Sequence, residues 1–229
     1  MKLGIMQPYF MPYIGYWQLM AAVDTYVVYD DVNYIKGGWV SRNNILLNGK
    51  KHMFTITLNG ASPNKLFNEI TIKDDFKKFS RLIESAYRKA PYYYEVSALL
   101  ERIYSFEDRS LGAFMMNSFQ VVLDYLDITT KLILSSSIEK DNTLRAKDKV
   151  KHICHLLGAD TYYNAIGGQE LYDKDDFYSH NIELKFIQPE IQPYQQLNNE
   201  FIGGLSIIDV LMWNDIKNVK DILNKYVLI

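Results

Sequence analysis

The chain has 229 residues, of which 48% are hydrophobic, enough to bury the core of one large domain spanning residues 1–229. Its formal net charge of -2 gives no overall attraction to nucleic acid or to an anionic membrane, so we expect neither DNA nor a membrane as a partner. The single cysteine, Cys154, excludes an intrachain disulfide and a zinc site made of several cysteines. With no signal peptide at its start, the sequence predicts a cytoplasmic protein.

The chain begins with a predicted β-α-β unit. Residues 3–6 form an apolar run typical of a buried strand, residues 17–23 predict a helix, and residues 25–29 are β-branched and aromatic, as in a second strand. Two such strands joined by a helix pair in parallel through a right-handed crossover. The sequence therefore predicts an α/β fold with a Rossmann-like start.

We call residues 7–16, between the first strand and its helix, the proline loop. Pro8 and Pro12 fix the backbone dihedral φ, so we expect a rigid connector. Ligands bind at the carboxyl ends of strands in open α/β sheets, and Gly15 allows close approach where the helix starts. The loop is thus a predicted ligand site, with packing of its aromatic rings against the core as the alternative. Its predicted substrate-binding residues are Gln7, Tyr9, Pro12, Gly15 and Tyr16.

A cluster of charged, amide and aromatic residues follows the second strand. Its members are Asp30, Asp31, Lys36, Trp39, Arg42 and Asn43. Paired acids can hold a divalent ion or act as a general base, whereas Lys36 and Arg42 can bind phosphate or carboxylate groups. We therefore predict catalytic roles for both acids, Lys36 and Arg42, and substrate binding by Trp39 and Asn43. The alternative is a network of surface ion pairs beside a hairpin.

A β-hairpin and a helical insert are predicted next. Residues 39–47 and 52–58 flank Asn48-Gly49, the dipeptide preferred in tight hairpin turns. Residues 68–72 can add an edge strand. In the helical insert, residues 74–127, Asp74 is the predicted N-cap of the first helix. The predicted helices of the insert cover residues 74–89, 93–104 and 111–126.

The rest of the chain alternates between strands and helices, which supports the α/β fold. The predicted strands are residues 131–134, 161–163 and 182–186, and the predicted helices are residues 145–157, 175–178, 206–213 and 217–227. Cys154 lies on the apolar face of its helix and is a predicted core thiol. His152 and His155 lack the spacing of helical metal ligands, so we expect no zinc and no metal site.

Two later segments add candidate binding residues. Gly167 and Gly168 lie in a loop at a strand end, and Ser206 and Asp209 lie at the start of a helix. Capping of that helix alone explains Ser206 adequately. The sequence contains no G-x-S-x-G motif, no P-loop, no G-x-G-x-x-G and no H-E-x-x-H. The reaction therefore cannot be identified from an established nucleophile or phosphate-binding motif.

Four motifs together resemble the WbqC-like protein family. They are residues 7–16, the block 29–36 with Trp39, Arg42 and Asn43, residues 167–172 before Phe177, and residues 205–211. The resemblance covers nearly the whole chain, although Asn214-Asp215 stands where the family pattern has a glycine, which leaves the end of the preceding helix open. Members are found with genes for bacterial surface polysaccharide (O-antigen). The resemblance implies work on a nucleotide-linked amino sugar, by acylation or aminoacylation of its amine.

A second similarity concerns only the layout. A strand, a loop, a glycine and an aromatic residue at a helix start resemble the nucleotidyltransferase superfamily, whose H-x-G-H motif binds triphosphate. Pro12 and Tyr16 occupy the places of the two histidines. Without an imidazole to stabilise the leaving phosphate, we expect a nucleotide-binding cleft rather than adenylyl transfer.

The leading hypothesis is an enzyme that transfers an acyl or aminoacyl group from a donor to the amine of a nucleotide-linked amino sugar. Asp30 or Asp31 would deprotonate or orient the amine, and Tyr9, Tyr16 and Trp39 would stack on base or sugar. The alternatives are a nucleotidyltransferase-like enzyme that needs Mg²⁺ and a non-catalytic binding protein of polysaccharide assembly. The sequence does not decide whether the chain forms a homo-oligomer.

Overall fold

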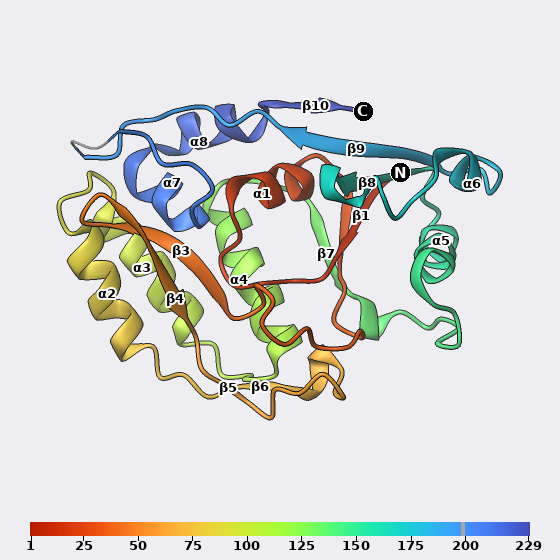
Figure 1. The fold of residues 1–229 in the computed structure, drawn as a ribbon, viewed down its shortest axis with the longest axis horizontal. Coiled ribbons are helices and arrows are strands. Elements are labelled where there is room, and N and C mark those ends of the chain that lie inside the picture. Colours follow the sequence, from red (N-terminus) through yellow and green to blue (C-terminus); the bar gives the residue numbers. More distant parts are fainter. Residues whose placement is uncertain (198–199) are drawn as a thin grey trace.

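A computed structural model of the protein describes residues 1–197 and 200–229. In these residues one central sheet has six strands in the order β10-β9-β8-β1-β2-β7 (Figure 1). The strands are β1 (Lys2–Met6), β2 (Thr25–Val28), β7 (Lys131–Leu134), β8 (Thr161–Ala165), β9 (Glu183–Pro189) and β10 (Tyr226–Leu228). All neighbouring strands pair in parallel except β10, which is antiparallel to β9. The predicted α/β fold with a parallel β-α-β start is confirmed, and its Rossmann-like detail stays a prediction.

The strand order reverses at β1. From β1 the chain proceeds through β2 to β7 on one side, whereas β8 returns to the other side of β1 and β9 continues outward. In open parallel sheets such a reversal leaves a crevice at the carboxyl ends of the two diverging strands, and this crevice is where ligands bind. Here the two strands are β1 and β8, and the proline loop follows β1 directly.

Both faces of the sheet are covered by helices. Leu3, Ile5 and Val27 pack on one face with α5 (Ala146–Leu156) and α6 (Lys174–Tyr178). On the other face, Tyr26 and Val28 join a larger core that includes α1 (Ile14–Ala21) and α8 (Ile216–Leu223). Strands buried on both faces are nearly continuous apolar runs, which is why β1 and β2 can be read from the sequence.

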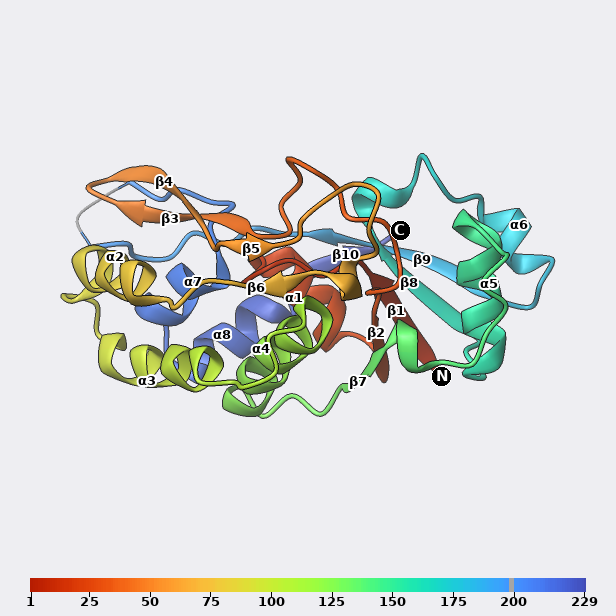
Figure 2. The same cartoon turned by 90° about the horizontal axis from the view of Figure 1, so that it is seen from below.

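The helical insert and the hairpin extend the larger core away from the sheet. The insert contains α2 (Lys77–Tyr87), α3 (Tyr93–Tyr104) and α4 (Leu111–Tyr125), and α7 (Ile207–Trp213) packs with them. Figures 1 and 2 show α2 and α3 at one end of the molecule and α5 and α6 at the other. Five phenylalanine rings from the proline loop, the hairpin and the insert meet in this core, namely Phe10, Phe54, Phe76, Phe79 and Phe114.

The predicted hairpin is confirmed. Strands β3 (Arg42–Leu47) and β4 (Lys50–Thr55) pair antiparallel, with Asn48 and Gly49 between them. Both turn residues have positive φ, 51° and 73°, as the tight turn that suits twisted strands requires. The predicted edge strand is shorter than expected: β6 (Thr71–Ile72) pairs with the two-residue strand β5 (Leu58–Asn59), and Thr71 also forms an isolated bridge with Ser110.

The prediction for the start of α2 was wrong. Asp74 does not cap the helix, which begins three residues later, after Phe76 in the left-handed conformation with φ of 58°. The Asp74 carboxylate instead accepts hydrogen bonds from the backbone N–H groups of Phe76 and Thr57, each at 2.8 Å. The strained Phe76 is tolerated because its buried ring stacks on Tyr104 and Phe114.

The C-terminal prediction was also partly wrong. The predicted helix 217–227 ends at Leu223, and Tyr226–Leu228 then form β10, because these residues complete a ladder with β9. Asn214 does not need to be a glycine, because its backbone is extended, a conformation that any residue adopts. The helix α7 therefore ends at Trp213. Asp215 then caps α8 by accepting a hydrogen bond from the N–H of Asn218 at 2.7 Å. In the residues described, no helix is long and apolar enough to cross a membrane.

Cys154 provides a test of the smaller core. Its side chain is fully buried, and burial raises the pKa of its thiol to about 12. We expect Cys154→Ala to lower the free energy of unfolding by about 1 kcal/mol, as a small deletion in a packed core. A thiol reagent should react far more slowly with the native protein than with the urea-unfolded protein, and equal rates would contradict this burial.

Candidate functional site

A cavity of about 650 Å³ lies at the carboxyl ends of β1 and β8, where the strand order reverses. Three segments form its walls: the proline loop, the stretch after β2, and the turn after β8. Of the predicted binding residues, seven line it: Gln7, Tyr9, Tyr16, Trp39, Asn43, Gly167 and Gly168. The structure thus brings together residues that are up to 161 positions apart (168 − 7) along the chain.

Hydrogen bonds from distant segments fix the proline loop. Met11 is fully buried with φ of 47°, a strained conformation for a residue with a side chain. Its carbonyl accepts hydrogen bonds from Asn43 Nδ2 at 2.6 Å and Ser206 Oγ at 2.7 Å. The Pro12 carbonyl accepts from Trp17 Nε1 at 3.1 Å and from the backbone N–H of Ile207 at 2.8 Å. Pro12 and Ser206 therefore lie outside the cavity wall and position the loop.

Tyrosine rings form the part of the wall next to α1. Tyr9 and Tyr16 meet edge to face with ring centroids 5.2 Å apart, and Tyr16 donates a hydrogen bond to the Gln7 carbonyl at 3.2 Å. Burial raises the pKa of both phenols above its ordinary value, so they stay neutral donors at physiological pH. Gly15 is not itself a residue of the cavity wall. A Cβ at this position would lie 2.6 Å from the ring of Tyr13, so the glycine leaves room for the ring of this wall residue.

The turn after β8 contributes a polar group that the sequence reading did not single out. Asn164 is 94% buried and lines the cavity; its Oδ1 accepts the N–H of Ala165 at 2.8 Å. Among the described residues its Nδ2 has no hydrogen-bond partner. In the sequence, the position of Asn164 near the end of a strand and three residues before Gly167 was the signal that could have identified it. A buried amide without a partner in a cavity wall is a ready donor for a ligand.

Among the described residues that line this cavity, none has a charged side chain. Its surface consists of aromatic rings, aliphatic groups, amides and backbone. Trp39, half exposed, lies at this wall. Such a surface suits flat or hydroxyl-rich neutral groups, which stack on rings and exchange hydrogen bonds with amides.

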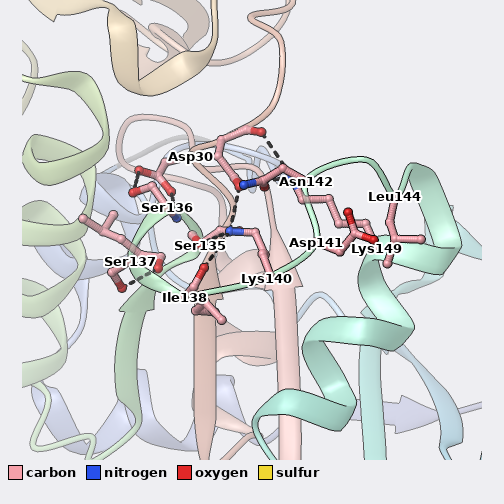
Figure 3. A network of polar contacts seen from close by, with 12 residues as sticks. Asp30, Ser135, Ser136, Ser137, Ile138, Lys140, Asp141, Asn142, Leu144 and Lys149 are labelled. Carbon is pink, nitrogen blue, oxygen red and sulfur yellow. Dashed lines mark hydrogen bonds and ion pairs between the residues drawn. The ribbon is translucent and has the colours of Figure 1, made fainter.

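The four predicted catalytic residues lie outside the cavity wall. Asp30 is buried, and its carboxylate accepts hydrogen bonds from the N–H and the hydroxyl of Ser136, at 2.9 and 2.7 Å (Figure 3). Lys36 is exposed. Arg42 donates to the Gly37 carbonyl, and its guanidinium carbon lies 5.6 Å from the centre of the Trp39 ring. Arg42 thus supports a wall residue, and the catalytic roles of these residues stay predictions.

Asp31 lies in a buried ion-pair cluster. Its Oδ2 is 2.8 Å from Lys140 Nζ and 3.0 Å from Lys149 Nζ, and both lysine side chains are almost fully buried. Burial alone would raise the pKa of Asp31, but the hydrogen bonds and charges of the two lysines hold this pKa below its ordinary value. The Asp31 carboxylate is therefore ionised across the neutral range.

Asp209 also lies outside the cavity wall, in the larger core. It is fully buried and accepts hydrogen bonds from the Tyr87 hydroxyl at 2.8 Å, the Tyr194 hydroxyl at 2.6 Å and Gln196 Nε2 at 2.6 Å. Burial raises the pKa of Asp209 despite these donors. The carboxylate ties α7 to α2 and to the segment that precedes α7, so its visible role is to hold these segments together.

The described residues contain no group of three or more His, Cys, Asp and Glu side chains that could hold a metal ion. The two acids of the predicted pair diverge, because Asp30 bonds to Ser136 and Asp31 to the lysines.

Fold and site define an α/β protein with a cavity at the strand-order reversal, lined by aromatic rings and, among the described residues, by no charged side chain. The sequence model of the WbqC-like protein family matches residues 7–221, so the chain belongs to this family, as its motifs predicted. It is also similar to "Uncharacterized protein Rv1507c" of Mycobacterium tuberculosis (strain ATCC 25618 / H37Rv), with 26% identity over 216 residues that cover 92% of each chain. No solved structure matches the chain.

The two glycines after β8 give a matched pair of variants. A Cβ at Gly168 would lie 2.5 Å from Asn164 Nδ2, whereas a Cβ at Gly167 meets nothing within 4 Å. We expect Gly168→Ala to lower the free energy of unfolding by about 1–2 kcal/mol through overpacking. Gly167→Ala should leave it unchanged or slightly raised, because alanine restricts the unfolded chain. Urea unfolding of both variants checks this, and equal stabilities would contradict the close approach at Gly168.

The cluster around Asp31 predicts a pH-dependent stability. Asp31→Asn leaves two buried ammonium groups without a counter-charge and should cost about 3 kcal/mol at pH 7. Because the folded pKa of Asp31 lies below 3.8, its contribution is present above that pH and is lost as the pH falls through the folded pKa. The gap between wild type and variant in urea unfolding should narrow below about pH 4. The exposed Asp148→Asn is the control, and a gap that stays constant with pH would refute the assignment.

Proposed function

We propose that the protein is an enzyme of bacterial surface-polysaccharide (O-antigen) biosynthesis. In this proposal it binds a nucleotide-linked amino sugar and transfers an acyl or aminoacyl group to the sugar amine. Membership of the WbqC-like family and the character of the cavity support the proposal. The observation that carries it is the cavity wall at the strand-order reversal, which offers rings and amides and no charged side chain.

The cavity suits the neutral parts of such a ligand. Trp39 and Tyr9 present faces for stacking of a base or the apolar face of a sugar, and neutral phenols and amides bond to hydroxyl groups. A carboxylate or ammonium in the wall would favour charged ligands, and the part of the wall that the structure describes contains neither. The cavity volume of about 650 Å³ lies within the usual range for small-molecule sites.

The proposed reaction forms a bond between the amine nitrogen and the acyl carbonyl carbon. Negative charge then develops on the carbonyl oxygen until the bond to the leaving group of the donor breaks and the amine proton is lost. The free Nδ2 of Asn164 is a donor that can stabilise this oxyanion, and so is the neutral phenol of Tyr9, whose oxygen accepts the N–H of Tyr13 and keeps its own proton. The amine reacts in its neutral form, and the proton that its nitrogen loses leaves with the departing group of the donor. Asp31 lies outside the cavity wall, and its lowered pKa makes it a weak base for this proton.

A non-catalytic binding protein of polysaccharide assembly is the second candidate. The described residues of the cavity wall include no acid, no lysine or arginine and no histidine, which favours it, because general acid–base catalysis needs a titratable group within hydrogen-bond reach of the substrate. The two candidates differ in turnover. Incubation of an amino-sugar nucleotide with activated acyl donors, followed by mass spectrometry, detects the acylated product or its absence.

Trp39 gives the test of ligand binding. A screen of nucleotide sugars, with and without Mg²⁺, should find one that raises the melting temperature. Trp39→Ala should weaken binding of that ligand about tenfold, the effect of losing one stacking ring, while the half-exposed side chain leaves the fold intact. Tyr94→Ala is the control, because Tyr94 is an exposed ring outside the cavity wall.

No shift with any nucleotide sugar would argue against the proposal. Equal weakening by both substitutions would place the ligand outside this cavity.

A further inference from the structure

A second, smaller pocket lies beside the cavity, at the carboxyl ends of β2 and β7. Its volume is about 390 Å³, and it is formed by the residues after β2, the loop after β7 and the start of α5. Lys140, Arg145 and Lys149 line it together with one acid, Asp31. Asn68, Asn142 and Ser136 add polar groups to the same wall. This pocket is rich in cations, whereas the cavity has no charged lining residue.

The two lysines of this pocket are buried and share one carboxylate. Lys140 also donates to the carbonyls of Ser135 and Ile138, and Lys149 to the carbonyl of Asp31. Their side chains are 1% and 7% exposed, and both contact the same carboxylate oxygen of Asp31. The neighbouring acid, Asp30, accepts hydrogen bonds from Ser136 instead (Figure 3). With Arg145, three cationic side chains and one carboxylate line the pocket, so positive charge is in excess there. Buried ammonium groups are costly unless they are compensated by negative charge.

Arg145 adds exposed donors at the same pocket. One nitrogen of its guanidinium, Nη1, donates to the carbonyls of Asn142 and Leu144. Nη2 and Nε have no partner among the described residues. A planar guanidinium with free N–H groups suits the oxygen atoms of a phosphate, and lysine ammonium groups add charge.

Tyr29 connects the pocket to the cavity. It lines the cavity, and Lys149 Nζ lies 5.5 Å from the centre of its ring. Burial, then the charge of Asp31, raises the pKa of Tyr29 to about 12, while Arg145 acts in the opposite direction. Groups from the pocket therefore reach a residue of the cavity wall. A ligand with a neutral part and an anionic part has a place for each.

We propose that the pocket of Asp31, Lys140, Arg145 and Lys149 is a subsite for a phosphate or diphosphate group. Tyr29 separates it from the cavity, which takes the uncharged part of the ligand. Assigning both parts to one nucleotide-linked sugar rests on the proposed function. Binding of an inorganic polyanion at the pocket is independent of the proposed function.

The test uses inorganic pyrophosphate and isothermal titration calorimetry. Arg145→Gln and Lys149→Gln should each weaken pyrophosphate binding at least tenfold relative to wild type. Lys147→Gln is the matched control: it removes the same charge from the same helix, but Lys147 pairs with Asp176 and is outside the pocket. It should change the affinity less than twofold. Arg145 is exposed and Lys140 still pairs with Asp31 when Lys149 is replaced, so folding should survive.

Two results would overturn the subsite. One is a wild-type protein that does not bind pyrophosphate, and the other is equal weakening by Lys147→Gln, which would show a diffuse charge effect. The experiment also separates this inference from the proposed function. Trp39→Ala should leave pyrophosphate affinity unchanged. Pyrophosphate binding without binding of any nucleotide sugar would support the subsite and count only against the proposed function.

Discussion

The arrangement of the site depends on two backbone carbonyl groups, those of Met11 and Pro12. A buried carbonyl that loses its water must find donors inside the protein. Here the donors come from Asn43 in the hairpin, Trp17 in α1, and Ser206 and Ile207 at the start of α7. Four hydrogen bonds thus hold one loop to the helix that follows it and to two distant parts of the chain, and they offset the strained φ of Met11.

This anchoring explains how a loop of aromatic residues becomes a cavity wall. Phe10 points into the core and meets other phenylalanine rings, while Tyr9 and Tyr13 line the cavity. If the loop could rotate, all of these rings would collapse onto apolar surface. Because its backbone is held on both sides, some rings stay available for a ligand. The prolines limit the backbone further, as the sequence indicated.

Much of the fold was readable from local patterns. The apolar runs of β1 and β2, the Asn48-Gly49 turn and the glycines after β8 each carry their signal within a few residues. Partners far along the chain were not readable. The hydrogen bonds that the Asp30 carboxylate accepts from Ser136, 106 positions later, could not be foreseen. Lys140 and Lys149 lie in a polar part of the sequence, which is typical of a solvent-exposed segment. Only the three-dimensional packing shows that their side chains are buried.

The hydrogen bonds of Asp209 have a consequence for sequence variation within the family. Three donors from two segments, Tyr87 in the insert and Tyr194 and Gln196 before α7, share one buried carboxylate. Loss of any donor leaves part of that charge uncompensated, so a substitution at one of these positions favours a second substitution at another. Relatives should therefore exchange these residues as a group, while the exposed faces of α2 and α3 drift independently.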